Sequence, residues 1–241
     1  MTPSFSEIWV YLSGSPLLWL TVTLLAYRAA YAIHRRSGLN PIANPVLISV
    51  TCIVCVLLLS NTPYQTYFDG AQCVHLLIGP ATVALAIPLY AQIERLRMML
   101  FPLTIALLVG SVSAIGSAVA IGWAFGASTD ILLSLAPKSA TMPIAMGVSE
   151  KIGGLPSLTA LTVAITGIAG AIMARGLLNL MRIEDCAVRG FAVGMTAHAI
   201  GTAYALQVSE LAGAFAALAM GLNGVATTLL LPLMVRLAGS P

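Results

Sequence analysis

Residues 131–150 read ILLSLAPKSATMPIAMGVSE, and this segment decides how the chain passes through a membrane. Its length suits one crossing, because a helix needs about 20 apolar residues to span the hydrocarbon. However, Pro137 and Pro143 flank a lysine and two hydroxyl residues, and each proline removes a backbone donor and disrupts a helix. The pattern predicts a broken or re-entrant segment, which is tolerated only where it lines protein or a water-filled cavity.

The composition of the whole chain indicates an integral membrane protein. Of the 241 residues, 59% are hydrophobic and 8% are charged, whereas a soluble domain carries about 25% charged residues. The mean hydropathy is +0.97. The net charge is only +3, and no long run of Lys and Arg is present, which argues against a nucleic-acid partner. The predicted fold class is an all-α polytopic membrane protein that lies in a lipid bilayer.

Apolar stretches separated by polar joints predict eight hydrophobic segments. They are residues 12–33, 45–60, 71–92, 99–124, 131–150, 156–181, 188–208 and 211–235. Lys and Arg gather at residues 34–44, 93–98 and 182–189, so the positive-inside rule predicts that these joints and the C-terminus are cytoplasmic and that the N-terminus is outside. This orientation requires one segment that does not cross simply, and the proline-interrupted fifth segment is the expected one.

Short motifs recur along the second half of the chain. Residues 145–150 read AMGVSE and residues 205–210 read ALQVSE, while TGIAG at 166–170 is followed later by NGVAT at 223–227. This order predicts an internal repeat. Many transporters consist of repeated units with interrupted helices and have their substrate site at the repeat junction.

Lys138 is the first candidate for a binding residue. A charge at membrane depth costs several kcal/mol, and Ser139 and Thr141 stand beside it at the expected helix break. Backbone N–H groups at such a break also attract anions. The functional interpretation is an anion site, and the alternative is a lysine that extends its ammonium to the membrane interface.

A second candidate cluster is Thr196, His198 and Thr202 in the sequence MTAHAIGTAYA. These residues could form the other half of a substrate site, with an imidazole that binds a carboxylate or carries a proton. Alternatively they pack between helices, and the hydroxyls bond to carbonyls four residues earlier. Asn223 lies within the last apolar segment and could bond either to a ligand or to a neighbouring helix.

No pattern in the chain points to an enzyme. The GxSxG, HExxH and Walker motifs are missing, and the three histidines are too scattered to suggest a metal site. Cys52 and Cys55 have CxxC spacing, but they lie in an apolar run without further ligands. We therefore expect no catalytic residue, no metal and no cofactor.

Several motifs in fixed order carry a family resemblance. They are PKSATMPIAM (137–146), IGG (152–154), LTA (158–160), TGIAGA (166–171), AHAIGTA (197–203) and GLNGVAT (221–227). Together they resemble the CidB/LrgB family of bacterial membrane proteins. The resemblance runs from roughly residue 40 to the end, which predicts a CidB/LrgB-like transmembrane domain at residues 41–241. The apolar run and the basic joint before it predict an N-terminal transmembrane helix and a cytoplasmic joint at residues 1–40.

The resemblance implies a multi-pass protein of the bacterial inner (cytoplasmic) membrane, with one of two functions. Family members are described as antiholin-like or holin-like regulators of murein hydrolases and autolysis, which act with a membrane partner of the CidA/LrgA type. Relatives are also implicated in moving glycolate, glycerate and pyruvate. The buried cation and broken backbone favour a secondary transporter of small carboxylate anions, and the antiholin function is the alternative. Small-residue faces would also allow a homodimer.

Overall fold

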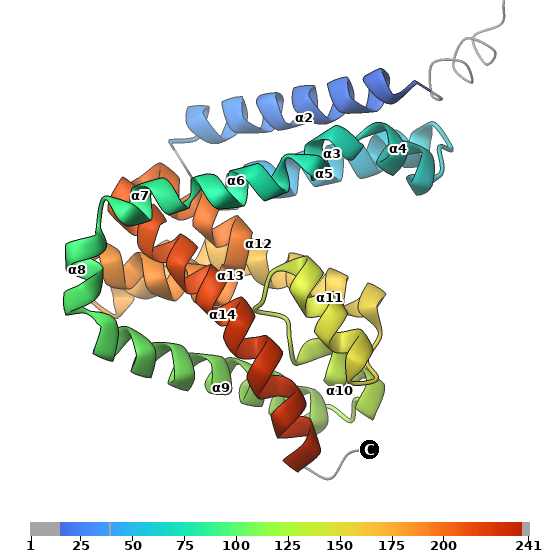
Figure 1. Cartoon of the computed structure of the whole chain (residues 1–241). Helices are drawn as coiled ribbons and strands as arrows, with labels where there is room; N and C mark the ends of the chain where they lie inside the picture. The colour runs from blue at the N-terminus through green and yellow to red at the C-terminus, as the bar shows by residue number, and fades with distance from the viewer. Residues whose placement is uncertain (1–14, 39, 238–241) are drawn as a thin grey trace, which may run out of the picture. The chain divides into compact units, whose positions relative to one another are not determined.

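The computed structural model describes residues 15–38 and 40–237, and every regular element within these ranges is a helix. The chain divides into two compact units, Met1–Ala84 and Leu85–Pro241. Helices long and apolar enough to cross a membrane occur in both units (Figure 1). Their described spans are Leu17–Arg36, Gln72–Tyr90, Leu100–Ala124, Pro156–Leu180 and Glu210–Leu237. The expected all-α polytopic membrane fold is confirmed.

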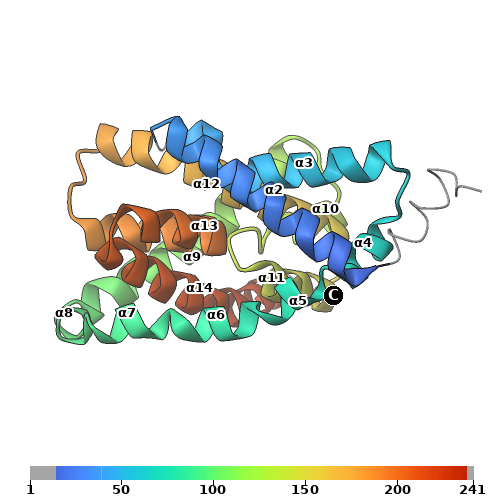
Figure 2. The same ribbon diagram turned by 90° about the horizontal axis from the view of Figure 1, so that it is seen from above.

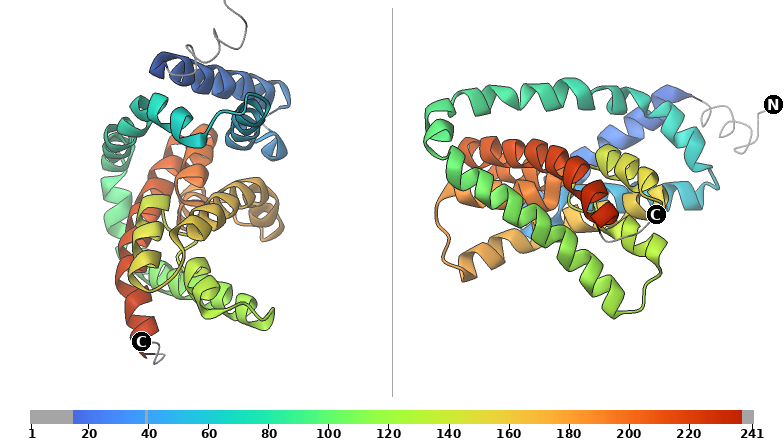
Figure 3. Two further views of the ribbon diagram at one scale, coloured as in Figure 1. Left: turned by 90° about the vertical axis from the view of Figure 1, so that its right-hand side faces the viewer. Right: turned by 60° about the horizontal axis from the view of Figure 1, so that its bottom comes forward.

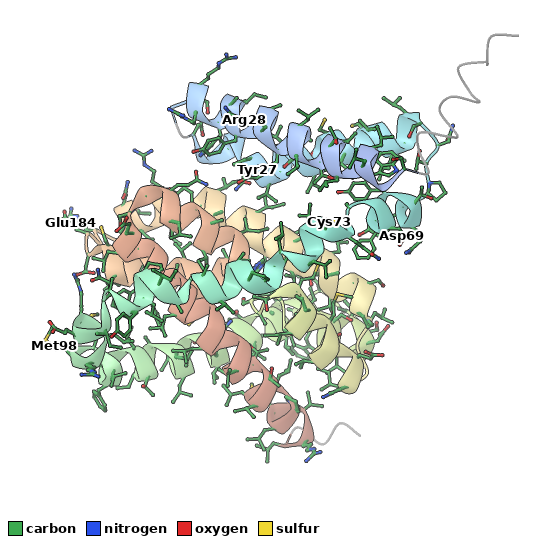
Figure 4. All side chains as sticks on the ribbon, turned by 45° about the horizontal axis from the view of Figure 1, so that its top comes forward. Tyr27, Arg28, Asp69, Cys73, Met98 and Glu184 are labelled. Carbon is green, nitrogen blue, oxygen red and sulfur yellow. The ribbon has the colours of Figure 1, made fainter. Side chains whose placement is uncertain are left out.

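The first unit is organised around α2 (Pro16–Arg36) and α3 (Pro45–Leu59), which lie side by side (Figure 2). Its other elements are the 3₁₀ turn η1 (Pro41–Ala43), α4 (Tyr64–Gly70), α5 (Gln72–Leu76) and α6 (Ile78–Ala84). The Asn44 side chain caps the start of α3 by accepting bonds from the next backbone amides. The ring of Trp19 on α2 packs edge to face against the ring of Tyr67 on α4, with 5.8 Å between the ring centroids. This contact packs α4 against α2. Figure 4 shows Arg28 and Asp69 toward opposite ends of this unit.

The second unit begins with the short helices α7 (Ala86–Tyr90) and α8 (Ile93–Met98) and contains three long ones. These are α9 (Leu100–Ala124), α12 (Pro156–Leu180) and α14 (Glu210–Leu237). Leu103 near the start of α9 packs in one cluster with Phe215 near the start of α14. Ile115 further along α9 packs with Leu231 near the end of α14. Helices α9 and α14 therefore run in the same direction (Figure 3).

The fifth hydrophobic segment forms a helical hairpin, which we call hairpin A. Its arms are α10 (Thr129–Leu135) and α11 (Met142–Lys151), and residues 136–141 form the turn between them. Leu132 lies against Gly122 near the end of α9. In α11, Ile144 lies against Gly224 and Val148 packs with Leu231, so α11 returns toward the end of α14. The predicted broken, re-entrant segment is confirmed by these contacts.

The seventh segment, α13 (Cys186–Val208), also reverses its direction, and we call it hairpin B. The helix is interrupted at His198, where φ is 40° and ψ is −130°. In the first arm, Gly190 lies against Ala212 and Gly194 against Ala216, so this arm runs parallel to α14. In the second arm, Leu206 lies against Gly213, and Thr202 lies 3.8 Å from the sulfur of Met220. The contacts of this arm therefore run back along α14. The prediction that the seventh segment crosses simply was wrong.

The two hairpins open toward opposite ends of the second unit. Arg95 on α8 forms an ion pair of 2.6 Å with Asp185, which precedes hairpin B, and Met98 and Glu184 lie at this same end (Figure 4). Helix α14 starts there with Glu210 and runs to the other end with Arg236. The prediction that the C-terminal segment ends on the same side as residues 93–98 and 182–189 was therefore wrong. Because hairpin B returns to its starting side, the last helix crosses in the direction opposite to the expected one.

The repeated motifs occupy equivalent places in this arrangement. AMGVSE lies in the second arm of hairpin A. ALQVSE covers the end of the second arm of hairpin B and the first residue of α14, Glu210. TGIAG and NGVAT lie in the long helices α12 and α14. Each repeat is thus a hairpin followed by a crossing helix. Since the two hairpins open toward opposite ends, the repeat is inverted, as in many transporters.

Candidate functional site

The tips of hairpins A and B meet beside the same residue of α12. Val163 packs in a buried cluster with Ala140 and Ala145 of hairpin A. The carbonyl oxygen of Val163 also lies 2.9 Å from Nε2 of His198 at the tip of hairpin B. Although the two tips are far apart in sequence, they come together at this point of α12.

The tip of hairpin A carries three of the residues proposed from sequence. Lys138 is half-buried, Ser139 is buried and Thr141 is half-buried. Among the described residues, no carboxylate lies within ion-pair distance of the Lys138 ammonium. The ion pair that the described part of the chain contains joins Arg95 and Asp185, at the base of hairpin B. Thr141 is the N-cap residue of α11, but its side chain makes no capping bond. The first N–H groups of α11 therefore have no partner in the side chain of the cap residue and can bond to another group.

The acidic residues on either side of this tip in sequence, Asp130 and Glu150, both stand at the outer ends of the hairpin arms, away from the turn. Glu150 is exposed and stands at the far end of the 10-residue helix α11, which is about 15 Å long at 1.5 Å per residue. This length is half of a hydrocarbon layer of roughly 30 Å. The tip thus lies at mid-depth when the base of the hairpin is at the interface.

His198 holds the tip of hairpin B in an unusual backbone conformation. Positive φ is rare for residues other than glycine, and such conformations cost of order 1–3 kcal/mol. The His198 side chain is 4% exposed. Because a carbonyl oxygen only accepts, Nε2 must donate the bond to Val163, and in the neutral ring Nδ1 is then the acceptor. Nδ1 has no hydrogen-bond partner among the described residues.

The two threonines beside His198 occupy different environments. Thr202 is buried and donates to the carbonyl of His198 at 2.8 Å, which is the packing role that the sequence left open as an alternative. Thr196 is exposed and donates to the carbonyl of Ala192 at 2.8 Å on its own helix. The structure therefore brings His198 and Thr202 to the tip region, while Thr196 faces outward.

Asn223 of α14 joins both tips. Its amide Nδ2 donates to the carbonyl oxygen of Ser139 at 3.0 Å and to that of Met195 at 3.1 Å. Its Oδ1 accepts a bond of 2.7 Å from the hydroxyl of Ser111 on α9. Neither Ser111 nor Met195 was predicted from the sequence. The only signal in the sequence was a serine within an apolar helix, and its partner lies 112 residues away.

A second hydroxyl cluster lies at the base of hairpin A. Thr159 Oγ1 lies 2.7 Å from Ser149 Oγ and 3.0 Å from the carbonyl of Ser134. The Ser134 hydroxyl accepts from the backbone N–H of Leu155 at 2.7 Å. These three hydroxyl side chains are fully buried. Their hydrogen bonds connect both arms of the hairpin to the start of α12. Their role is therefore structural.

Comparison with known proteins finds relatives that match over most of the chain. A family model described as the LrgB-like family matches residues 23–237. The uncharacterized proteins YxaC and YwbG of Bacillus subtilis (strain 168) are 35% and 34% identical, over 92% and 90% of this chain and 96% of each of theirs. The antiholin-like protein LrgB of Bacillus cereus (strain B4264) is 27% identical over 93% of this chain and 98% of its own. No solved structure matches the chain.

Proposed function

The chain belongs to the LrgB-like family, and we propose that this member is a secondary carrier of small monocarboxylate anions. The substrate binds where the tips of hairpins A and B meet, beside Lys138. The observation that carries this function is the inverted pair of re-entrant hairpins whose tips both contact Val163. Interrupted helices that meet at mid-depth between inverted repeats are the general architecture of secondary transporter sites.

Electrostatics at the two tips favour an anion of single charge. Lys138 contributes one positive charge without a carboxylate in ion-pair reach among the described side chains. The second arms of both hairpins begin at the tips, and the start of a helix carries partial positive charge and unpaired N–H groups. A bound carboxylate would offset the cost of holding the ammonium at depth. The hydroxyls of Ser139 and Thr141 and the free Nδ1 of His198 are the groups available to orient such an anion.

Six of the residues proposed from sequence have three different roles under this function. Lys138, Ser139, Thr141 and His198 are the substrate-facing set, while Thr202 supports the backbone of His198. Thr196 is exposed on the outer face and has no part in the site. No step of this function needs a metal or a cofactor.

The second candidate function is antiholin-like regulation of murein hydrolase activity. It is favoured by a specific observation, namely that several relatives of matching length are named antiholin-like protein LrgB. In that role the protein would act by assembling with a CidA/LrgA-type partner or with a second copy of itself. The small residues on its helices, rather than Lys138, would then be decisive.

The distribution of arginines supports a proposal for the orientation of the protein. Arg95, Arg97, Arg182 and Arg189 lie at the end of the second unit where hairpin B opens. Under the positive-inside rule we expect this end to face the cytoplasm, and we propose a bacterial inner membrane as the location, which agrees with the antiholin-like names of the bacterial relatives.

Uptake of labelled glycolate and pyruvate into proteoliposomes tests the carrier function. We expect saturable uptake that falls by at least about tenfold, or 1.4 kcal/mol, in Lys138→Gln. The matched control is Lys151→Gln, which removes an exposed charge from the end of the same hairpin and should leave uptake unchanged. Equal uptake by Lys138→Gln and the wild type would contradict the site. Leakage of solutes of many sizes and charges would favour the antiholin-like function instead.

A further inference from the structure

We propose that Asn223 is a positioning residue that joins the tips of hairpins A and B into one body, rather than a residue that binds substrate. Only the consequence for transport rests on the proposed carrier function. The joining itself concerns the fold and can be measured without any substrate.

The hydrogen-bonding capacity of the Asn223 amide is already in use. A carboxamide has two N–H donors, and these reach the carbonyls of Ser139 and Met195. Both partners only accept, so the NH₂ group must face them and Oδ1 must face Ser111. The side chain is 1% exposed. No donor is left for a guest anion unless a bond to one of the tips breaks.

The two carbonyls need an external donor because the helices end there. The last four carbonyls of a helix have no partner within it, and the interruption at His198 puts Met195 among the last residues of the first arm of hairpin B. Ser139 lies in the turn of hairpin A, outside both arms. A buried carbonyl without a partner is destabilising, because it has lost its bonds to water without replacement. Asn223 satisfies one such carbonyl from each hairpin.

Ser111 fixes the orientation of this amide. Its side chain is 1% exposed, and its hydroxyl donates to Oδ1 of Asn223. Helix α9, helix α14 and the two hairpin tips are therefore connected through one buried amide. Separating one tip from the other would break at least one of these two buried hydrogen bonds and leave its carbonyl without a donor. In the transport cycle the tips consequently move together with α14, and access to the site must change elsewhere.

The test measures the distance between the tips in the full-length protein in lipid nanodiscs. Cys52, Cys55, Cys73 and Cys186 are first replaced by serine, and spin labels are attached at Met142→Cys and Ala199→Cys. Met142 is 39% exposed and Ala199 is exposed, and each residue adjoins one tip. We expect one narrow distance distribution in the wild-type background and a clearly broader one in Asn223→Asp, because an ionised carboxylate has no donor for either carbonyl.

Two further variants make the result decisive. Thr228→Val is the matched control, because the exposed Thr228 hydroxyl on the same helix bonds only to the carbonyl of Gly224, and it should retain the narrow distribution. Ser111→Ala should broaden the distribution to a smaller extent than Asn223→Asp. An unchanged distribution in Asn223→Asp would overturn the proposal. If that variant does not fold, an unchanged distribution in Ser111→Ala would overturn it.

Glycolate uptake separates this proposal from the carrier function. A positioning role predicts that the apparent KM of Asn223→Asp rises by about tenfold, while the maximal rate changes much less, because the binding groups remain present but are held less well. If the wild type does not transport glycolate, the carrier function fails and the distance measurement still decides whether Asn223 joins the tips. A broadened distance with an unchanged KM would overturn the positioning role.

Discussion

The amide nitrogen of Asn223 lies 3.0 Å from the carbonyl oxygen of Ser139, although 84 positions separate these residues in the chain. Asn223 stands near the middle of the 28-residue helix α14, which is about 42 Å long at 1.5 Å per residue. The bond therefore places the turn of hairpin A at the level of the centre of a crossing helix. A membrane-spanning α14 has both hairpin tips near mid-depth, where a charged or polar group is costly unless it is paired or functional.

The inverted hairpins make a prediction about sidedness. Cysteines introduced at Lys151 and at Ser209, each at the end of the second arm of a hairpin, should react with a membrane-impermeant thiol reagent from opposite sides of the membrane. We expect Ser209→Cys to be cytoplasmic, because it shares its end with the Arg95–Asp185 pair. The measurement uses a background without the four native cysteines. Labelling of both positions from one side would contradict the hairpin structure of α13.

The close packing of hairpin B on α14 makes a prediction about glycine. A Cβ at Gly194 would overlap the carbonyl oxygen of Ala216, so Gly194→Ala must force the first arm away from α14. Overpacking of this kind costs about 1–3 kcal/mol and should lower the melting temperature in detergent. Gly176→Ala is the control, because nothing lies within 4 Å of its Cβ position. It should be neutral or stabilising by about 0.5–1 kcal/mol.

The backbone at His198 predicts an unusual order of stabilities. His198→Gly loses the bond to Val163, but glycine adopts positive φ without strain. His198→Val loses the same bond, and a β-branched residue is a genuine outlier at this φ. We expect the glycine variant to unfold at a higher temperature than the valine variant, by the equivalent of roughly 1–3 kcal/mol. The reverse order in a thermal melt would show that the tip does not need this conformation.

Asp185 predicts an effect at the base of hairpin B. Its Oδ1 accepts from the backbone N–H groups of Ala187 and Val188, so Asp185→Ala should cost about 1 kcal/mol as a lost N-cap. Asp185→Asn keeps a capping oxygen and loses only the exposed pair with Arg95, which contributes at most about 1 kcal/mol. Chemical denaturation of the two variants compares these costs. Equal losses in both variants would mean that the cap contributes no measurable stability beyond the ion pair.

The same residue gives a pH dependence of defined sign. The bond from the Val188 N–H, aided by that from Ala187 and by Arg95, holds the pKa of Asp185 below its usual value. A carboxyl whose pKa is lower in the folded state stabilises the fold above its unfolded pKa of about 3.9, and this stabilisation is lost as pH falls through the lowered value. Wild-type protein should therefore lose more stability than Asp185→Asn below about pH 4. If the melting temperatures of the two proteins fell equally as the pH is lowered, this role of Asp185 would be contradicted.

Local chemistry explains which parts of the fold could be predicted from sequence. The expected segment 156–181 corresponds to α12 at Pro156–Leu180, and the segment 99–124 corresponds to α9 at Leu100–Ala124. Their lengths follow from apolar runs between polar joints. The break in hairpin A was predictable because Pro137 and Pro143 disrupt a helix in any context. Lys138 could be named as a candidate binding residue because a charge within an apolar segment is costly unless it has a function.

Hairpin B was not predictable for the opposite reason. No proline stands near His198. Histidine is enriched at positive φ, but positive φ is uncommon for any residue other than glycine, so a histidine within an apolar run does not by itself predict a reversal. The reversal depends on partners from distant segments, namely the carbonyl of Val163, which accepts from the imidazole, and the amide of Asn223, which satisfies Met195. Glycines 190 and 194 then allow the first arm to lie against α14. The error about the side of the C-terminus followed directly from missing this reversal.

By itself, the sequence determined that this is a polytopic membrane protein with about eight apolar segments, an internal repeat and a proline-broken segment that carries Lys138. These features depend on hydrophobic length, charge cost and proline geometry, which act within a few residues. The tertiary structure alone decided that a second hairpin meets the first, that the repeats are inverted, and that Ser111 and Asn223 connect the tips. A helix can be interrupted without proline only when distant groups satisfy the backbone it exposes, and no local pattern records which groups those are.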